Sequence, residues 1–309
     1  MDRKARMVEL LNMLAPREGY TLARLEGVKF MRANCRTQRM PVLYEPCIVI
    51  VVQGCKRGYV GDESFDYDAQ HFLVMSVPLP FEGETVSASE AEPMLAIKIP
   101  VDLKITAELA MALDAAGVPM ASAPRAFMSS PVDERLCDSV LRLLEALASP
   151  LEADLIGPGL LREIIYRVLT GPQGAALRAA LAHQSHFGKI GKALRRIHSD
   201  YSLPIDVATL AREAGMSLAA FHASFKEVTT TSPIQYLKTT RLHKARLLMV
   251  QDGLTAATAC SKVGYESTSQ FSREFKRFFG RTPVEEAREM RQLLAQQRGD
   301  SAAGYVTVQ

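Results

Sequence analysis

Two stretches in the last third of the chain repeat one pattern: DVATLAREAGMSLAAFHASFKEVTTTSP at residues 206–233 and TAATACSKVGYESTSQFSREFKRFFGRTP at residues 255–283. Their early positions match at a separation of 49 residues and their later positions at 50, because the second copy carries one extra residue in its turn. Self-similarity of this kind indicates one structural unit that is present twice. This repeat decides the fold of the C-terminal part.

Each copy has the pattern of two helices joined by a tight turn. Asp206 and Thr255 precede the first helix, and Ser217 and Ser267 precede the second, where side-chain oxygens accept hydrogen bonds from free N–H groups. A glycine ends each first helix, and phenylalanines at i and i+4 give each second helix an inward face. This is the helix-turn-helix motif, whose second helix enters the major groove of DNA. A single copy would favour an ordinary helical hairpin, but two copies joined by one long helix at Pro233–Gln251 predict a paired DNA-binding unit.

The charge of the chain is unevenly distributed. Residues 184–309 carry 18 Lys and Arg against 11 Asp and Glu, whereas residues 1–183 carry 19 against 23. A basic part joined to an acidic part is typical of a nucleic-acid-binding module attached to a domain of another kind.

The N-terminal part shows short apolar stretches between turn signals. The β-branched run Cys47–Gln53 is too short for a helix and ends at Gly54, so it predicts a buried strand. Further strands are expected at residues 56–60, 64–67, 71–77 and 94–99, and this spacing predicts a small antiparallel barrel or sandwich. Helical or irregular segments are expected at residues 1–15 and 21–25, helices at 103–116, 132–148 and 158–169, and a linker at 117–131.

The quoted motifs resemble a known family. Residues 264–283, GYESTSQFSREFKRFFGRTP, are very similar to the signature of the AraC/XylS family, in which a linker helix joins two helix-turn-helix subdomains. Residues 41–80, PVLYEPCIVIVVQGCKRGYVGDESFDYDAQHFLVMSVPLP, resemble the cupin-like ligand-sensing domain of one AraC subgroup.

The resemblance implies an α+β multidomain protein. Its N-terminal domain would be an antiparallel, cupin-like β-barrel with flanking helices, and its C-terminal domain would be all-α. The implied division is a ligand-sensing and dimerisation domain at 1–183, a DNA-binding domain at 184–298 with motifs at 206–228 and 255–279, and a flexible tail at 299–309. The resemblance also implies a homodimer formed by helices after the barrel. Leu136, Val140, Leu143, Leu144 and Leu147 make an apolar stripe that is expected to be mostly core.

Candidate DNA contacts lie opposite the core phenylalanines, near the start of each second helix. We expect base contacts from Ala219, His222 and Ala223 in the first motif, and from Thr268, Ser269, Ser272 and Arg273 in the second. We expect backbone contacts from Ser217, Lys226, Lys276 and Arg277. The alanines of the first motif cannot form side-chain hydrogen bonds with bases. We therefore expect most of the sequence specificity that depends on hydrogen bonds to come from the second motif, with Arg273 in contact with a guanine. The two helices are expected to enter successive major grooves, about 34 Å apart.

The linker helix is basic. Its cations are Lys238, Arg241, Lys244 and Arg246. Contacts with phosphates and a solvated charged face are both compatible with this pattern.

The N-terminal domain offers few chemical groups for catalysis. His71 is the only histidine of the barrel region, so no metal site or other cofactor is expected. Cys47 and Cys55 flank the predicted strand, and the charges of Lys56 and Arg57 would lower a thiol pKa and favour reaction with electrophiles. The alternative is that both are inert core residues. The remaining expectation is an apolar pocket for a small-molecule effector.

These features predict a transcription regulator rather than an enzyme, and we expect an activator that contacts double-stranded DNA and RNA polymerase. A DNA-repair methyl acceptor would need a cysteine cluster for zinc, and a cupin enzyme would need more histidines. Five scattered cysteines, no export signal and no run of eighteen apolar residues predict a cytoplasmic protein without a membrane contact.

Overall fold

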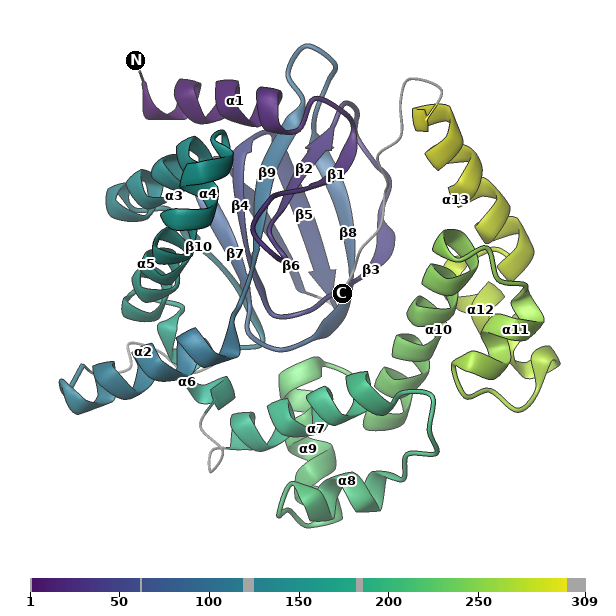
Figure 1. Cartoon of the computed structure of the whole chain (residues 1–309). Coiled ribbons are helices and arrows are strands. Elements are labelled where there is room, and N and C mark those ends of the chain that lie inside the picture. Colours follow the sequence, from purple (N-terminus) through teal and green to yellow (C-terminus); the bar gives the residue numbers. More distant parts are fainter. Residues whose placement is uncertain (1, 62, 119–124, 182–185, 299–309) are drawn as a thin grey trace.

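The strands of the N-terminal part form two antiparallel sheets that lie face to face (Figure 1). The structure is a computed structural model that describes residues 2–61, 63–118, 125–181 and 186–298. One sheet has the order β1 (Gly19–Leu22), β2 (Lys29–Ala33), β9 (Met94–Pro100), β4 (Cys47–Gln53), β7 (His71–Met75) and β10 (Phe127–Pro131). The other has the order β3 (Met40–Tyr44), β8 (Leu79–Ser87), β5 (Cys55–Val60) and β6 (Glu63–Asp68).

The antiparallel fold class is confirmed, but the expected closed barrel is not found. Among the described strands, each sheet ends in edge strands, β1 and β10 in one and β3 and β6 in the other, that do not pair across to the opposite sheet. Strand spacing along a sequence predicts how many strands there are. It does not predict whether the outer strands meet, because that depends on twist and on which strands pair.

Strand β4 is buried on both of its faces. Cys47, Val49 and Val51 face the space between the sheets, and the alternate residues Ile48 and Ile50 face the helices. The covering helices are α1 (Arg3–Leu14), α2 (Leu103–Ala115), α3 (Glu134–Leu147), α4 (Pro150–Leu155), α5 (Gly157–Thr170) and α6 (Gly174–Leu181). A strand that is buried on both faces has a continuous apolar run rather than alternation.

The apolar stripe of α3 lies inside the molecule. Leu136, Val140, Leu143, Leu144 and Leu147 are all buried, packed with residues of α1 and α5. The stripe is therefore core, as the sequence predicts.

The expected linker at 117–131 is partly a strand. β10 pairs with β7, with Phe127 opposite Met75 and Pro131 opposite His71. Its sequence FMSSP has no apolar alternation, and proline is tolerated there because β10 is an edge strand. Strands β1, β2, β3 and β8 and helices α4 and α6 were likewise not expected from the pattern.

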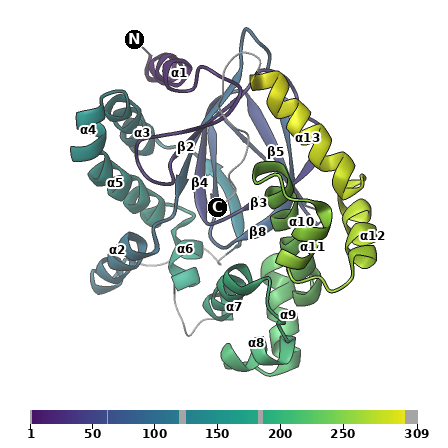
Figure 2. The ribbon, with the colours of Figure 1, turned by 45° about the vertical axis from the view of Figure 1, so that its right-hand side comes forward.

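The C-terminal part is helical, as predicted. Its elements are α7 (His186–Asp200), α8 (Val207–Glu213), α9 (Leu218–Thr229), α10 (Pro233–Gln251), α11 (Ala256–Lys262), α12 (Thr268–Phe279) and α13 (Pro283–Arg298). Figure 2 shows α10 in front of β3 and β8, which it contacts. The predicted domain boundary at 183/184 and the predicted tail 299–309 lie outside the described residues. No helix in the described ranges is long and apolar enough to cross a membrane.

The two repeats differ at the residue that ends the second helix. Gly280 ends α12 with φ 79°, and Thr230 ends α9 with φ 61°, a left-handed conformation that a β-branched residue rarely adopts. This conformation costs a non-glycine residue about 1–2 kcal/mol.

We therefore expect Thr230→Gly to stabilise the protein by about 0.5–1 kcal/mol, after the greater chain entropy of glycine is subtracted. Denaturant unfolding followed by helical circular dichroism measures the change. Thr231→Gly is the matched control and should destabilise, because Thr231 has no positive φ to relieve. Equal effects of the two substitutions would contradict the assignment of strain to Thr230.

Candidate nucleic-acid interface and effector site

The first motif is built as the sequence predicts. The Asp206 carboxylate accepts a hydrogen bond from the backbone N–H of Thr209 at 2.9 Å, and the Ser217 hydroxyl accepts one from Ala220 at 3.3 Å. Gly215, with φ 61°, forms the turn between α8 and α9. Phe221 and Phe225 are fully buried, so the opposite face of α9 is turned outward.

The second motif repeats this construction. Thr255 and Ser267 accept hydrogen bonds from the backbone N–H groups of Thr258 and Gln270, both at 3.2 Å. Gly264, with φ 82°, forms the turn between α11 and α12. The buried phenylalanines at residues 271 and 275 again fix which face of the second helix, α12, is outward.

The predicted base-reading residues lie on these outward faces. Ala219, His222, Ala223, Thr268, Ser269 and Arg273 are exposed, and Ser272 is half-buried. The predicted backbone residues Ser217, Lys226, Lys276 and Arg277 are exposed as well. Whether these residues contact DNA stays a prediction.

The cations on the outward faces are not neutralised within the protein. No carboxylate of the described residues forms an ion pair with Arg273, Lys276 or Arg277, nor with Lys226 on the first motif. A cation that keeps its charge at an exposed helix surface is available to a phosphate or a base edge.

The cations of the linker helix are half-buried and three of them are bonded within the protein, so they do not form a solvated charged face. Lys238 pairs with Glu274 at 2.8 Å, and Lys244 lies 5.8 Å from the ring centre of Tyr201. Arg241 donates to three backbone carbonyls, and Arg246 pairs with Glu286 at 2.9 Å. The sequence pattern missed this because a helix packed on several sides has no single solvated face.

Three lysines gather between the two sheets, a feature that sequence reasoning missed. Lys98 alternates with the inward-facing Met94 and Ala96, and it lies opposite Lys29 in the register of β9 and β2. Burial lowers the pKa of Lys29 to about 8, and the charge of Lys98 lowers it further in the same direction. The signal was present in the sequence as a lysine at an inward position of an apolar strand.

The opposite sheet and neighbouring tyrosines complete this cluster. Burial, with the charge of Lys98, lowers the pKa of Lys56 on β5 to about 8. The Lys98 ammonium lies 4.0 Å from the ring centre of Tyr44, and Tyr67 lies opposite Lys56 in the register. No ion pair joins Lys56 or Lys98 to a carboxylate in the described part of the chain. Desolvated like charges of this kind are costly, so the cluster suits an anionic group.

The two predicted sensor thiols are shifted in the direction opposite to the expectation. Burial raises the pKa of Cys47 to about 11. Burial, and then the charges of Asp66 and Asp68, raise the pKa of the half-buried Cys55. Arg57 lowers the Cys55 pKa as expected, but less than the other effects raise it. A sensing role stays a prediction for these thiols, without the thiolate that was expected to support it.

A chain of hydrogen bonds joins the N-terminal part to helices α7 and α10 of the C-terminal part. His198 on α7 lies 3.1 Å from the Glu45 carboxylate through Nδ1 and 2.8 Å from the Tyr236 hydroxyl through Nε2. Tyr236 on α10 is fully buried and donates to the carbonyl of Pro78 at 2.7 Å. Arg246 donates to the carbonyl of Pro41 on β3 at 3.3 Å. The loops and edge of the four-stranded sheet therefore contact both α7 and α10.

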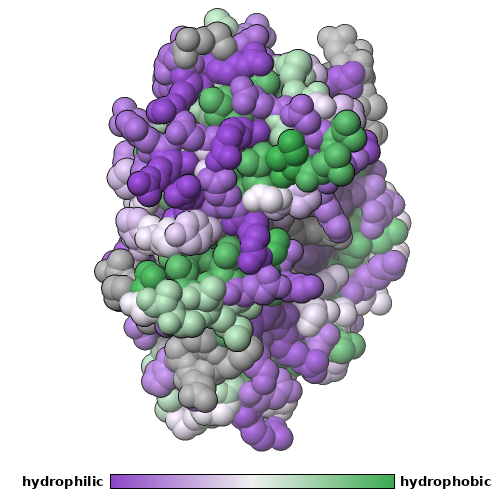
Figure 3. Space-filling model, turned by 60° about the vertical axis from the view of Figure 1, so that its left-hand side comes forward, coloured by the Kyte–Doolittle hydropathy of each residue, from purple (hydrophilic) through white to green (hydrophobic). Residues whose placement is uncertain are grey.

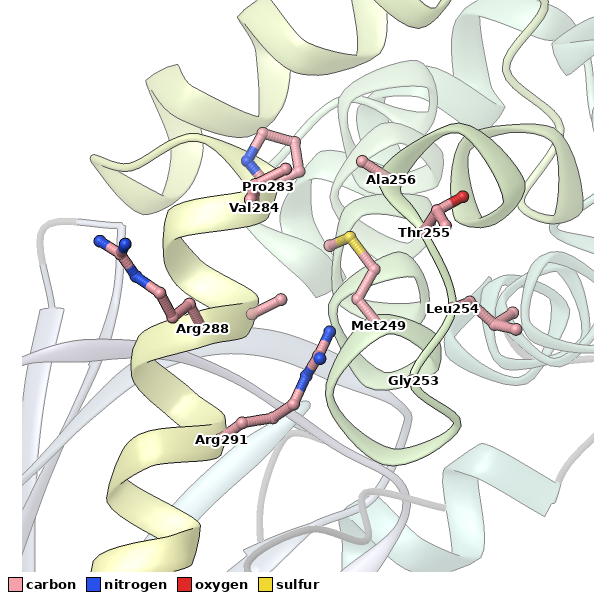
Figure 4. A pocket seen from close by; sticks show the side chains of 10 residues that line it. Met249, Gly253, Leu254, Thr255, Ala256, Pro283, Val284, Arg288 and Arg291 are labelled. Carbon is pink, nitrogen blue, oxygen red and sulfur yellow. The ribbon is translucent and has the colours of Figure 1, made fainter.

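A pocket with a cavity volume of about 580 Å³ lies between the α10–α11 loop and α13 (Figure 4). Met249, Leu254, Val284 and Ala287 give it apolar walls, and Arg288 and Arg291 of α13 line it as well. None of the predicted DNA-contacting residues lines this pocket.

A metal site is not assembled in the described ranges. No three His, Cys, Asp or Glu side chains of these residues come together as ligands. His71 Nδ1 lies 3.0 Å from the Asp68 carboxylate, near the surface.

Comparison with known proteins assigns the two parts of the chain to two family models. The model described as the AraC-type transcriptional regulator N-terminus matches residues 24–176, and a helix-turn-helix domain model matches residues 210–290. Among curated relatives, the regulator AlkR of Acinetobacter baylyi is 34% identical over 95 residues, 31% of each chain. The RCS-specific transcriptional activator RclR of Escherichia coli is 38% identical over 87 residues, 28% of this chain and 31% of the relative. The matched segment thus spans about a third of the length of these relatives.

Solved structures extend the likeness to most of the chain. Unsaturated fatty acid-bound ToxT from Vibrio cholerae superposes with a TM-score of 0.57 at 11% identity, covering 86% of this chain and 97% of ToxT. At this identity the likeness shows the fold alone: an N-terminal antiparallel sheet domain followed by a helical domain with helix-turn-helix motifs.

Proposed function

Since this chain belongs to the AraC/XylS family of regulators, we propose that it is a sequence-specific DNA-binding protein that regulates transcription in response to a small molecule. Residues 184–298 would bind DNA and residues 1–183 would receive the signal. The observation that carries the proposal is the pair of capped helices α9 and α12, with outward faces that hold un-neutralised cations and hydroxyls.

In this proposal α9 and α12 enter successive major grooves, about 34 Å apart. The first motif presents Ala219, His222 and Ala223, which suit thymine methyl groups and DNA shape. The second presents Thr268, Ser269 and Arg273, so it carries more of the hydrogen-bonded choice. The chain would therefore prefer asymmetric or direct-repeat sites.

We expect Arg273→Ala to weaken binding to DNA selected by the wild type by roughly 5- to 150-fold, because a guanine contact contributes about 1–3 kcal/mol. The variant should also lose the preference for one base at the contacted position. Fluorescence anisotropy with single-base variants of the selected site measures both effects. Arg277→Ala is the matched control, because a lost phosphate contact weakens all sequences alike and lowers the salt dependence by about one ion. A uniform loss for Arg273→Ala as well would remove Arg273 from base reading.

We also propose that the effector is an anionic amphipathic molecule held between the sheets. The ammonium groups of Lys56 and Lys98, with Lys29 beside them, would receive its anionic group, and the surrounding apolar core would receive its tail. The fatty acid in the ToxT structure, a protein of the same fold, supports this class of ligand.

With oleate as probe, we expect a rise in the thermal unfolding midpoint of the wild type and a rise reduced by more than half in Lys98→Met, because binding to the native state stabilises it. The ligand-induced shift, rather than the midpoint itself, is compared, since removal of a buried charge changes stability by itself. Lys104→Met, an exposed lysine on α2, is the control and should keep the full shift. An equal shift in Lys98→Met would exclude the lysine cluster, and no shift in the wild type would exclude this ligand class.

A role in transcription regulation also suggests where the protein acts and that it contacts RNA polymerase. We propose that the chain acts in the cytoplasm without catalysis, as an activator that contacts RNA polymerase. The activator name of RclR supports this sign of regulation. The pocket of Figure 4 offers polymerase a surface that the predicted DNA contacts leave free, with apolar walls and two arginines.

We propose a homodimer formed by the helical side of the N-terminal part, seen in Figure 3. The exposed apolar side chains of and beside α4, Leu151, Leu155 and Ile156, lie together and are our candidates for the interface; Leu155 is 74% exposed. Exposed apolar clusters mark interaction sites more often than single residues do. Sedimentation equilibrium should give the mass of two chains for the wild type and of one chain for Leu151→Ser/Leu155→Ser. A wild-type mass of one chain at micromolar concentration would exclude the dimer.

A further inference from the structure

The two helix-turn-helix motifs are connected mainly through the linker helix. Among the described helices, α10 packs against α9 of the first motif and α11 of the second, and Figures 1 and 2 show the motifs along α10. A cleft of about 930 Å³ otherwise lies between them, lined by residues of the α7–α8 loop, α10 and the α11–α12 segment. The position of one motif relative to the other therefore depends on the contacts that bridge this cleft.

Arg241, in the middle of α10, joins the second motif to the loop that leads into the first. Its guanidinium donates to the carbonyls of Tyr201 at 2.7 Å and Leu203 at 2.9 Å, both in the α7–α8 loop just before the first motif. It also donates to the carbonyl of Gly264 at 3.0 Å, in the turn of the second motif. A guanidinium presents its donors in a fixed plane, so three acceptors on one group fix both distance and rotation.

The backbone of the second motif touches the α7–α8 loop at the same point. Gly264 has φ 82°, and a Cβ atom there would lie 2.3 Å from the carbonyl oxygen of Ser202. Only a glycine allows this approach. The turn before α12 is thus pressed against the loop before α8, and Arg241 holds the two together.

The contact continues into the second recognition helix. The Tyr265 hydroxyl, one residue beyond Gly264, donates to the Glu274 carboxylate of α12 at 2.8 Å. Lys238, on the same linker helix as Arg241, pairs with Glu274 at 2.8 Å. On the side of the first motif, α7 ends just before the carbonyls that Arg241 binds, and it packs against α9. A movement at Arg241 would therefore move α12 relative to α9.

We propose that Arg241 is a positioning residue that sets the spacing between the two DNA half-sites this protein reads. The inference rests on the proposed DNA binding. One base pair of added spacing moves a half-site by about 3.4 Å and rotates it by about 35°. A protein whose two motifs are held in one arrangement cannot bind both half-sites after that displacement. If only the linker helix joined the motifs, they could shift relative to each other and still bind both half-sites.

Selection from a pool of random double-stranded DNA tests this without knowledge of the operator. The full-length wild type should enrich two sequence blocks at one spacing, preferred over spacings one base pair longer or shorter by more than about 10-fold. In Arg241→Met the same two blocks should be enriched, with the spacing preference reduced to less than about 3-fold. A merely stabilising residue would lower affinity for all spacings alike and leave this ratio unchanged.

Two further variants keep the test independent of folding. Arg241→Lys retains the charge but cannot reach three carbonyls with one ammonium, so its spacing preference should lie between those of Arg241→Met and the wild type. Lys244→Met is the matched control, because it removes from the same helix a cation that lies 5.8 Å from the Tyr201 ring centre but, unlike Arg241, forms no hydrogen bond or ion pair with the described residues of the second motif, and it should keep the wild-type spacing. Thermal unfolding confirms that each variant is folded at the selection temperature.

The outcomes separate this inference from the function on which it rests. One fixed spacing in Arg241→Met and Arg241→Lys overturns the role of Arg241 while leaving DNA binding intact. Relaxed spacing in Lys244→Met as well would assign the effect to charge and overturn it too. No enriched sequence with any of the proteins overturns the proposed DNA binding, and the role of Arg241 with it.

Discussion

The linker helix α10 is buried along most of its length, and the arrangement of the molecule depends on satisfying its polar groups there. Leu237, Leu242, Ala245 and Met249 are buried together with Tyr236, Thr240 and His243. A buried polar group costs free energy unless it finds a partner, so each such group constrains what may lie next to it. His243 stays neutral, because burial lowers its pKa to about 3, and it packs against the rings of Phe278 and Phe279. Its Nε2 and the Thr240 hydroxyl find no hydrogen-bond partner among the described residues. Tyr236 and Arg241 find theirs in three places: the N-terminal part, the loop before the first motif and the turn of the second motif.

The core between the sheets is governed by a different constraint, the repulsion of like charges. Lys29 and Lys98 are cross-strand neighbours, an arrangement that destabilises a sheet. The Tyr44 ring under Lys98 offsets part of this cost through a cation–π contact. Tyr44 belongs to β3, the strand whose Pro41 carbonyl accepts a hydrogen bond from Arg246. The charged core and the linker helix thus share one edge strand.

The sequence predicts the parts of this protein that local chemistry determines. Caps such as Asp206 and Ser267, turn glycines and paired phenylalanines act within a few residues, so the helix-turn-helix repeat and its outward faces follow from spacing alone. Lys98 and Arg241 could not be placed in this way, since their environments are made by residues far away in the chain. Lys98 faces inward because of its strand register, and Arg241 finds its acceptors in a turn 23 residues later and in a loop 38 to 40 residues earlier. The open sandwich escaped prediction for the same reason, because edge strands such as β10 pair over long range.

The bond from Tyr236 to Pro78 bears on how such proteins can be recombined. The hydroxyl and the carbonyl are both buried, and each satisfies the other across the boundary between sensor and reader. Joining this reader to a sensor from another protein would leave buried polar groups unmatched on both sides, at about 1–3 kcal/mol for each. The N-terminal and C-terminal parts therefore cannot be exchanged independently of each other. A working chimera would have to carry the loop around Pro78 and the strand around Pro41 along with α10, and natural exchange of one half would favour compensating changes in the other.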